Sequence, residues 1–208
     1  IIDLRGNVLA FSGRAITWDV RAKYVNTSDT LIYKKGENIF ALNFAKESGK
    51  DSLILCEGNM DVVSLHQAGF DNAVAGLGTA LTEQQASLLS RYASEILLCY
   101  DNDEAGQKAA RKALALFSKT TVHVKVINME GGKDPDEIIK KYGPERFKAL
   151  MNGAANDIEY KLLKAREGFN LNTSDGKVKF LEAACAVLAQ VKSPVELDVY
   201  AGRLSEEL

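Results

Sequence analysis

The 208-residue sequence has few cysteines, few prolines and no long apolar run. Its three cysteines are an odd number without C-x-x-C spacing, which argues against a disulfide framework and a zinc knuckle. We therefore expect Cys56, Cys99 and Cys185 to be reduced core residues. No apolar stretch approaches the roughly 18 residues that cross a bilayer, and no basic and apolar leader precedes a cleavage site. These absences disfavour membrane and secreted proteins.

The composition is that of an ordinary folded chain, with 46% hydrophobic and 26% charged residues, which excludes disorder and fibres. The sequence opens with Ile1 inside an alternating stretch, so we expect it to be a piece of a longer protein. Residues 1–50 hold 8 Lys+Arg against 5 Asp+Glu, and residues 51–130 hold 6 against 10. A basic entry beside an acidic middle favours a polyanion-binding, cation-dependent site, with plain solvated surface as the alternative.

Apolar strand-like runs alternate with helical patterns through the middle of the sequence. The runs are L-I-L-C-E, N-A-V-A-G, E-I-L-L-C-Y and V-H-V-K-V-I, and helices are expected before Gly69, over 83–92 and over 104–118. Thr82 and Gln85 form a capping-box pattern. Strands that alternate with helices pair in parallel through crossovers, and continuously apolar strands are covered on both faces. The pattern predicts a doubly wound α/β domain.

The flanking segments carry weaker patterns. Residues 8–16 predict a short hairpin or bulged strand pair, residues 30–33 another strand, and Glu37–Ser48 a helix. Beyond Gly132 no strand-like run recurs, and helical patterns punctuated by Gly, Pro and Ser continue to the end. We expect a small helical domain at about 153–208.

Six acidic residues follow the ends of the predicted strands: Glu57, Asp61, Asp101, Asp103, Asp134 and Asp136. Ligands of open α/β sheets bind at the carboxyl ends of the strands. Crowded carboxylates repel one another, by about 4 kcal/mol for a pair at about 4 Å and an effective dielectric of about 20, and a hard cation relieves this cost. Carboxylates without nearby Cys or His favour Mg²⁺ or Mn²⁺ over zinc. The pattern therefore predicts metal-assisted phosphoryl or nucleotidyl transfer, or phosphodiester cleavage.

Simpler interpretations exist for single residues of this set. An Asp between a strand and a helix is often an N-cap, which is the alternative for Asp61 and Asp136. Gly106 near a helix start could admit a phosphate, although a plain turn explains so short a pattern better. Donors of the basic segment could meet phosphates near the metal or could be solvated.

Four motifs together resemble the Toprim domain of DnaG-type bacterial primases. They are E-G-N-M-D-V at 57–62, G-L-G-T at 76–79, Y-D-N-D-E-A-G at 100–106 and G-K-D-P-D-E at 132–137. The first 50 residues resemble the end of the preceding subdomain, in G-R, K-Y-V-N and K-K-G, and the tail is similar to the helical subdomain that closes the core. The resemblance implies a Toprim-type parallel sheet with flanking helices over 51–152, preceded over 1–50 by part of a small α+β basic subdomain and followed over 153–208 by a helical subdomain.

The resemblance implies a DNA-directed RNA polymerase that synthesises short primers by metal-dependent nucleotidyl transfer. Glu57, Asp101 and Asp103 are then the catalytic metal ligands, and Asp61, Asp134 and Asp136 complete the acidic cluster around Mg²⁺ or Mn²⁺. The residues expected to meet the nucleotide or the template are Arg14, Lys23, Asn26 and Lys35.

The implied partners are single-stranded DNA, ribonucleoside triphosphates and the RNA–DNA hybrid product, at a cytoplasmic replication fork and without a membrane. A replicative helicase would bind through a domain outside this sequence, and zinc would occur only in another such domain. One alternative is a Toprim nuclease or topoisomerase, against which the K-Y-V-N and K-K-G blocks argue. The other, for this fragment alone, is a non-catalytic module that binds nucleotide or DNA.

Overall fold

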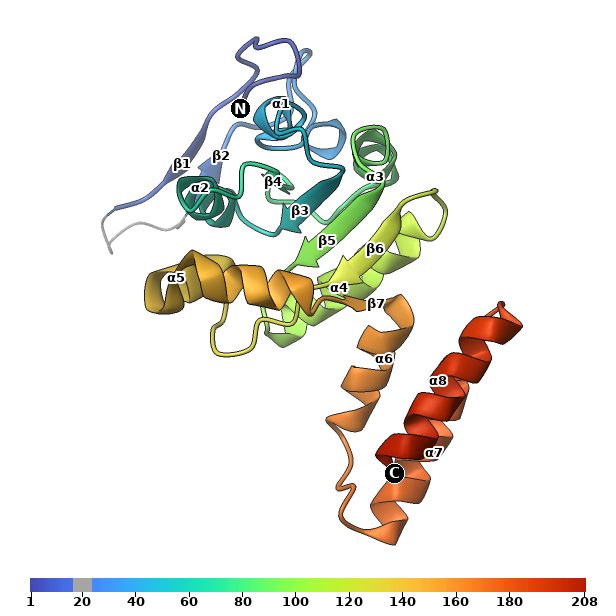
Figure 1. Ribbon diagram of the computed structural model, residues 1–208. Helices are drawn as coiled ribbons and strands as arrows, with labels where there is room; N and C mark the ends of the chain where they lie inside the picture. Colours follow the sequence, from blue (N-terminus) through green and yellow to red (C-terminus); the bar gives the residue numbers. More distant parts are fainter. Residues whose placement is uncertain (17–23) are drawn as a thin grey trace. The chain divides into compact units, whose positions relative to one another are not determined.

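The computed structural model describes residues 1–16 and 24–208 and divides the chain into two compact units (Figure 1). The first unit is Ile1–Ala154 and the second is Ala155–Leu208. Residues 1–50 belong to the same compact unit as the sheet. A compact unit can contain more than one subdomain, and the three-domain division therefore stays a prediction.

A parallel sheet forms the centre of the first unit. Its strands are β3 (Ser52–Cys56), β4 (Ala73–Ala75), β5 (Glu95–Cys99) and β6 (His123–Val126). Their spatial order is β4-β3-β5-β6, and each neighbouring pair is parallel. Cys56 lies opposite both Ala75 and Cys99, so the carboxyl ends of three strands meet at one edge.

A helix follows each of these strands, as the alternating pattern predicts. The helices are α2 (Asn59–Gln67), α3 (Glu83–Leu89), α4 (Glu104–Phe117) and α5 (Pro135–Asn152). The capping box of Thr82 and Gln85 is present at the start of α3. Gly143, with φ of 78°, has a backbone conformation outside the helical range, and this kinks α5 ahead of Pro144. Glycine is suited to this position because other residues rarely adopt a positive φ. The doubly wound α/β prediction is confirmed.

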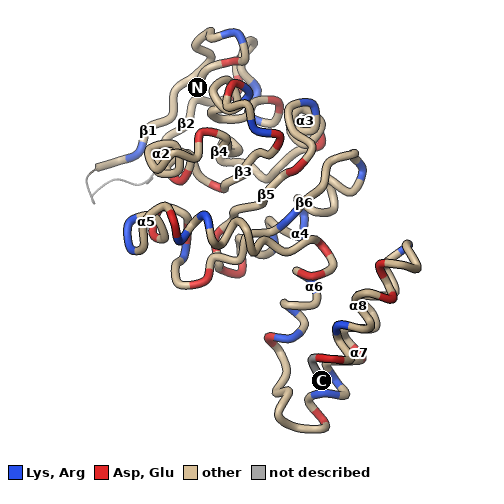
Figure 2. Tube along the Cα trace, in the orientation of Figure 1, with Lys and Arg blue, Asp and Glu red and all other residues tan. Residues whose placement is uncertain are grey.

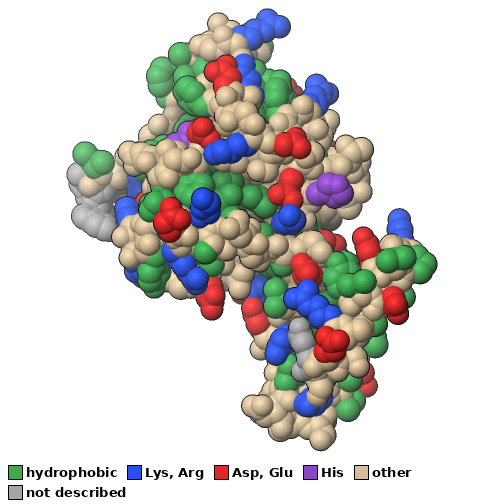
Figure 3. All heavy atoms as spheres, in the orientation of Figure 1, with side chains coloured by type: hydrophobic (Ala, Val, Ile, Leu, Met, Phe, Trp, Pro, Cys, Tyr) green, Lys and Arg blue, Asp and Glu red, His purple; other side chains and the backbone are tan. Residues whose placement is uncertain are grey.

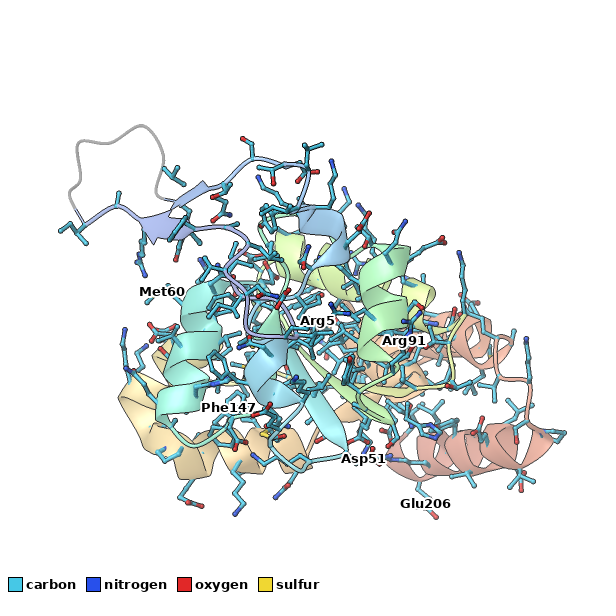
Figure 4. The ribbon with its side chains drawn as sticks, turned by 90° about the horizontal axis from the view of Figure 1, so that it is seen from above. Arg5, Asp51, Met60, Arg91, Phe147 and Glu206 are labelled. Atoms are coloured by element: carbon cyan, nitrogen blue, oxygen red, sulfur yellow. The ribbon has the colours of Figure 1, made fainter. Side chains whose placement is uncertain are left out.

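Side chains of the strands alternate between two apolar layers. Ile54 and Leu97 pack on one face against buried residues of α2 and α5, including Phe147, which Figure 4 labels between these helices. Because successive side chains of a strand point to opposite faces, the buried Leu55 and Leu98 face the other layer, which α3 and α4 cover. Both faces of the sheet are therefore dry, as the continuously apolar strands require.

The weaker predictions for the first 50 residues are wrong in detail. The strand β1 (Ser12–Arg14) pairs antiparallel with β2 (Tyr24–Asn26) rather than within 8–16, and residues 30–33 form no strand. The predicted helix over 37–48 shortens to α1 (Leu42–Ala45), after the 3-10 turn η1 (Lys35–Glu37).

Tertiary contacts explain the short α1. The Phe40 N–H donates to the carbonyl oxygen of Ala75 at 2.9 Å, which ties this segment to the edge of the sheet. Ala41 then adopts φ of 63°, which interrupts a helical path that the local apolar spacing would otherwise favour.

The second unit contains the short strand β7 (Ala155–Asn156), then α6 (Asp157–Arg166), α7 (Ser174–Leu188) and α8 (Pro194–Glu207). Its core includes Phe180 and Leu204. Two predictions are corrected here: a strand does occur beyond Gly132, and Cys185 is exposed, whereas Cys56 and Cys99 are buried and reduced. Charged side chains of both signs are scattered over the visible face, among hydrophobic and uncharged side chains (Figure 3). Among the described helices, none has the length and apolarity to cross a membrane.

Candidate metal and nucleotide site

A pocket of about 370 Å³ opens at the carboxyl ends of β3 and β5. We call it the acid pocket, because its lining includes five carboxylates against two cationic side chains. Figure 2 shows acidic positions in red on α2 and α5, which flank it. Seven of the ten predicted site residues line this pocket: Arg14, Asn26, Glu57, Asp61, Asp101, Asp134 and Asp136.

Glu57 is anchored at the end of β3 by the neighbouring strand. The backbone N–H of Asp101 donates to its Oε1 at 3.1 Å. Gly106 at the start of α4 makes this arrangement possible, because a Cβ there would lie 2.0 Å from the Asp101 carbonyl oxygen and 2.7 Å from Glu57 Oε1. The glycine thus serves close packing of the helix on the strand end, and it lies in the first turn of α4 rather than in a plain turn.

Asp61 and Asp136 approach the pocket from two packed helices. Asp61 lies in the first turn of α2 and accepts a hydrogen bond from the Gly58 N–H. Asp136 lies in the first turn of α5, where the Ser64 hydroxyl and the Lys140 ammonium donate to it. Although burial opposes ionisation, these donors hold the pKa of Asp136 below its usual value.

The N-cap alternative for Asp61 and Asp136 is wrong, and the caps are two other acids of the set. Asp103 caps α4 by accepting from the Gly106 N–H at 2.9 Å. Asp134 caps α5 by accepting from the Glu137 N–H at 2.8 Å. Asp134 also lines the acid pocket, whereas Asp103 faces the start of its helix.

Burial and the crowding of carboxylates raise the pKa of two acids in this pocket. Burial, together with the charges of Asp101 and Asp103, raises the pKa of Glu57. Burial, together with the charges of Asp134 and Asp101, raises the pKa of Asp61 to about 7. The site therefore holds more negative charge than the protein itself compensates.

This donor set fits a hard divalent cation, because it offers carboxylate oxygens without histidine or thiolate. As the side chains stand, no group of three acidic, histidine or cysteine residues converges to hold a metal within 1–16 and 24–208. Binding of a cation would therefore require rotation of some of these side chains.

Basic and amide groups face the acids from β1 and β2. The Arg14 guanidinium lies 5.6 Å from the centre of the Tyr24 ring, and its charge lowers the pKa of Asp136. Asn26 Oδ1 accepts from the Ser12 hydroxyl at 2.6 Å, and that hydroxyl accepts from Asn59 Nδ2 at 3.2 Å. These bonds connect the small sheet to α2.

The other two predicted basic residues are Lys23 and Lys35. Lys23 lies outside the described residues. Lys35 lies in η1, where its carbonyl oxygen accepts from the buried Gln85 amide of α3 at 2.9 Å. Lys35 therefore belongs to a surface beside α3.

Lys133 lines the acid pocket and is not among the site residues predicted from the sequence. Its carbonyl oxygen accepts from the Asn102 N–H at 3.0 Å, which joins the loops after β5 and β6. Its ammonium charge acts to lower the pKa of Glu57, against the net upward shift. A lone cation inside G-K-D-P-D-E, between two acidic motifs, is the sequence pattern that could have identified it.

Three family models match successive parts of the chain. Residues 1–46 match "DNA primase catalytic core, N-terminal domain", residues 54–139 match "Toprim-like", and residues 158–208 match "DnaB-helicase binding domain of primase". The last match shows that part of this chain is similar to a helicase-binding domain. This differs from the expectation that a helicase would bind through a domain outside the sequence.

A solved DnaG primase catalytic domain bound to single-stranded DNA is 32% identical, has a TM-score of 0.76, and is matched over 99% of this chain and 68% of its own. The chain belongs to the DnaG primase catalytic-core family. The RNA polymerase domain of Mycobacterium tuberculosis DnaG, solved with a double-stranded DNA oligomer that has a 6-nucleotide overhang, is 30% identical over 99% of this chain and 68% of that chain, with a TM-score of 0.86. The DNA primase of Clostridium acetobutylicum is 41% identical over 100% of this chain.

These matches confirm the resemblance to DnaG-type primases and the Toprim-type fold. They favour the primase prediction over the nuclease or topoisomerase alternative. The chain spans about a third of the length of the C. acetobutylicum relative, at 35%.

Proposed function

We propose that this chain is the catalytic core of a DNA-directed RNA polymerase that synthesises short RNA primers on single-stranded DNA. The observation that carries the proposal is the acid pocket, where carboxylates that follow β3 and β5 and carboxylates at the starts of α2 and α5 line the same space as Arg14 and Asn26. Acids that face phosphate-binding donors across one pocket suit metal-assisted nucleotidyl transfer. The reaction would be attack of a ribonucleotide 3′-hydroxyl on the α-phosphate of the next nucleotide, with pyrophosphate as the leaving group.

Divalent cations, Mg²⁺ or Mn²⁺, would be held by Glu57, Asp61, Asp101, Asp134 and Asp136, with Asp103 at the neighbouring helix start. When bound, such a cation neutralises phosphate charge and lowers the pKa of a coordinated hydroxyl. Carboxylates whose pKa is raised by burial and by neighbouring carboxylates gain the most from the cation, because its charge favours their ionised form.

The other side chains of the pocket would orient the substrate. Arg14 presents a guanidinium that suits bidentate contact with phosphate oxygens, and Lys133 adds a compact charge near Glu57. The Asn26 amide can donate to the nucleotide or the template, and Lys23 and Lys35 would likewise contact the triphosphate or the template backbone. Fixed donors of this kind lower the entropic cost of aligning the two nucleotides.

The partners proposed for this chain are a single-stranded DNA template, ribonucleoside triphosphates and the RNA–DNA hybrid, in the bacterial cytoplasm. Relatives solved with single-stranded DNA or an overhanging duplex support the template. The match over 158–208 supports a helicase contact through the second unit.

Calorimetric titration of the chain with Mn²⁺, with and without ATP, tests the metal site, and templated synthesis tests the activity. We expect cation binding that raises ATP affinity, and at least about tenfold weaker cation binding in Glu57→Gln, since a direct anionic ligand is lost. Glu104→Gln is the matched control, because Glu104 is an exposed residue at the start of α4 and does not line the pocket. Equal cation affinity in the two variants would refute the site. Tight binding of ATP and template without synthesis would favour a non-catalytic module instead.

A further inference from the structure

Three sulfur-bearing side chains meet at the edge of the sheet where the acid pocket opens. Cys56 and Cys99 are the last residues of β3 and β5 and lie opposite one another in the parallel register. Because paired residues of neighbouring strands project to the same face, the two thiols come close enough to share a hydrogen bond. The Cys99 thiol also donates to Met129 Sδ at 3.8 Å. We call these three side chains the sulfur cluster.

The sulfur cluster is closed to water. Cys56, Cys99 and Met129 are each 1% exposed, and all three belong to the apolar core that the sheet forms with α2 and α5. A hard cation such as Mg²⁺ would have to leave its water ligands there without oxygen donors to replace them. A soft cation is favoured instead, because thiolate and thioether sulfurs are the ligands that it prefers.

The spacing of the sulfurs matches their spacing around a bound metal. Metal–sulfur bonds of about 2.3 Å place two sulfurs about 3.8–4.0 Å apart, at angles between the tetrahedral and the trigonal value. Cys99 Sγ and Met129 Sδ already have this separation. The cluster therefore needs little rearrangement to bind a cation.

The number of ligands distinguishes between soft cations. Zn²⁺ in a closed site takes four ligands. In residues 1–16 and 24–208, no third His, Cys, Asp or Glu converges with the two thiols, so the thioether of Met129 is the only further donor that contacts them there. Cu(I) accepts fewer ligands than Zn²⁺ and binds both thiolate and thioether sulfur. The donor set therefore suits Cu(I).

We propose that the sulfur cluster binds one Cu(I) ion between the sulfurs of Cys56, Cys99 and Met129. The two thiols release their protons to solvent and bind as thiolates, the thioether binds without a change of charge, and no electron is transferred. Because both cysteines end their strands, the ion can enter by local opening of the sheet edge. The chain then has two metal sites of opposite chemistry in adjacent residues, with a thiolate at Cys56 and a carboxylate at Glu57. This inference does not depend on the proposed function.

Anaerobic titration with Cu(I), in competition with the chromogenic chelator bicinchoninate, tests the site. Cys99→Ala removes the sulfur that contacts both others, and Cys185→Ala is the matched control, because Cys185 is exposed and lies in the second unit. We expect the wild type and Cys185→Ala to take one Cu(I) per chain from the chelator and to gain thiolate-to-copper absorption in the near ultraviolet. Cys99→Ala should bind Cu(I) at least about 100-fold more weakly, because a direct thiolate ligand is lost.

A second variant covers the case in which Cys99→Ala does not fold, which far-UV circular dichroism would show. Met129→Leu keeps the apolar volume and both thiols, and should weaken Cu(I) binding about tenfold. Met151→Leu makes the same change at a partly buried position outside the cluster and should have no effect. If the wild type takes no Cu(I), or if Cys185→Ala abolishes the uptake, the three sulfurs serve core packing only and the site is refuted. Wild-type affinity in either Cys99→Ala or Met129→Leu would also overturn the three-sulfur site.

Discussion

At the scale of single residues, the acid pocket shows how one residue type serves two purposes. Asp103 and Asp134 accept hydrogen bonds from helix N–H groups, whereas Asp61 is held among like charges. A capping aspartate stabilises the fold by about 0.5–2 kcal/mol, but a carboxylate kept ionised among other carboxylates destabilises it. Function and stability therefore make opposite demands on neighbouring acids.

Asp61→Asn should stabilise the protein in the presence of a chelator. Because the folded pKa of about 7 is above the usual aspartate value of 3.8, the wild type loses stability as the pH rises from about 4 and stops losing it above about 7. The gain in free energy of unfolding should be as much as about 4 kcal/mol at pH 8 and near zero at pH 4. Urea denaturation at several pH values measures it.

Asp71→Asn is the control of opposite sign. The hydrogen bond from Lys50 lowers the pKa of Asp71, so this exposed carboxylate adds stability above its unfolded pKa and loses that contribution as the pH falls. The variant should be slightly less stable than the wild type at pH 8. A pH-independent gain in Asp61→Asn would contradict the electrostatic explanation.

Gly106→Ala should destabilise the fold and weaken the metal site together. The added methyl group would overlap the Asp101 carbonyl and displace Glu57. We expect a loss of about 1–3 kcal/mol, the usual cost of overpacking, and weaker Mn²⁺ binding by calorimetry. Gly202→Ala in α8 is the control, because nothing lies within 4 Å of its added Cβ, and it should gain about 0.5–1 kcal/mol. Normal Mn²⁺ affinity in Gly106→Ala would show that Glu57 does not depend on this contact.

At the scale of elements, α3 connects the sheet domain to the basic segment. Its buried Gln85 completes the capping box with Thr82 and also donates to the carbonyl oxygens of Lys35 and Asn38 at 2.9 Å and 2.8 Å. One side chain thus satisfies the start of a helix and the turn η1, which is about 50 residues earlier in the chain. The position of this turn depends on tertiary hydrogen bonds rather than on its own sequence.

Gln85→Leu should therefore cost more than the loss of a cap. Two carbonyl oxygens and the Thr82 N–H would lose their partner in a buried place, at about 1–3 kcal/mol for each group that water does not reach. Urea denaturation should show a loss of about 2–4 kcal/mol. The neighbouring Gln84 is exposed, and Gln84→Leu should change stability by less than about 0.5 kcal/mol. Similar losses in both variants would contradict this role of Gln85.

At the scale of the whole molecule, the two compact units have separate cores. Phe180 is buried with Ala184, Leu188 and Leu204 in the second unit, whereas Phe147 is buried under the sheet in the first. Because each unit buries its own apolar residues, we expect damage to one core to remain local.

Phe180→Ala should lower the stability of the second unit by about 3–5 kcal/mol and leave the Mn²⁺ affinity of the acid pocket unchanged. Phe147→Ala is the matched variant of the first unit, where it should reduce both the stability and the Mn²⁺ affinity, since α5 carries Asp136. Denaturation followed by far-UV circular dichroism and calorimetric titration give the two readouts. Loss of metal binding in Phe180→Ala would show that the units are energetically coupled.

The parallel sheet, the capping box of α3 and the meeting of acids at the strand ends could be predicted from the amino-acid sequence, because they depend on local periodicity and on the direction of parallel strands. The sequence did not predict which acids cap helices, that Lys133 lines the pocket, or that α1 is short. These outcomes depend on contacts between distant residues, such as Phe40 with Ala75, for which no local pattern exists. Local sequence patterns specify the helices and strands. Long-range hydrogen bonds and packing decide where a helix such as α1 begins and ends and which residues at the ends of the elements line the pocket.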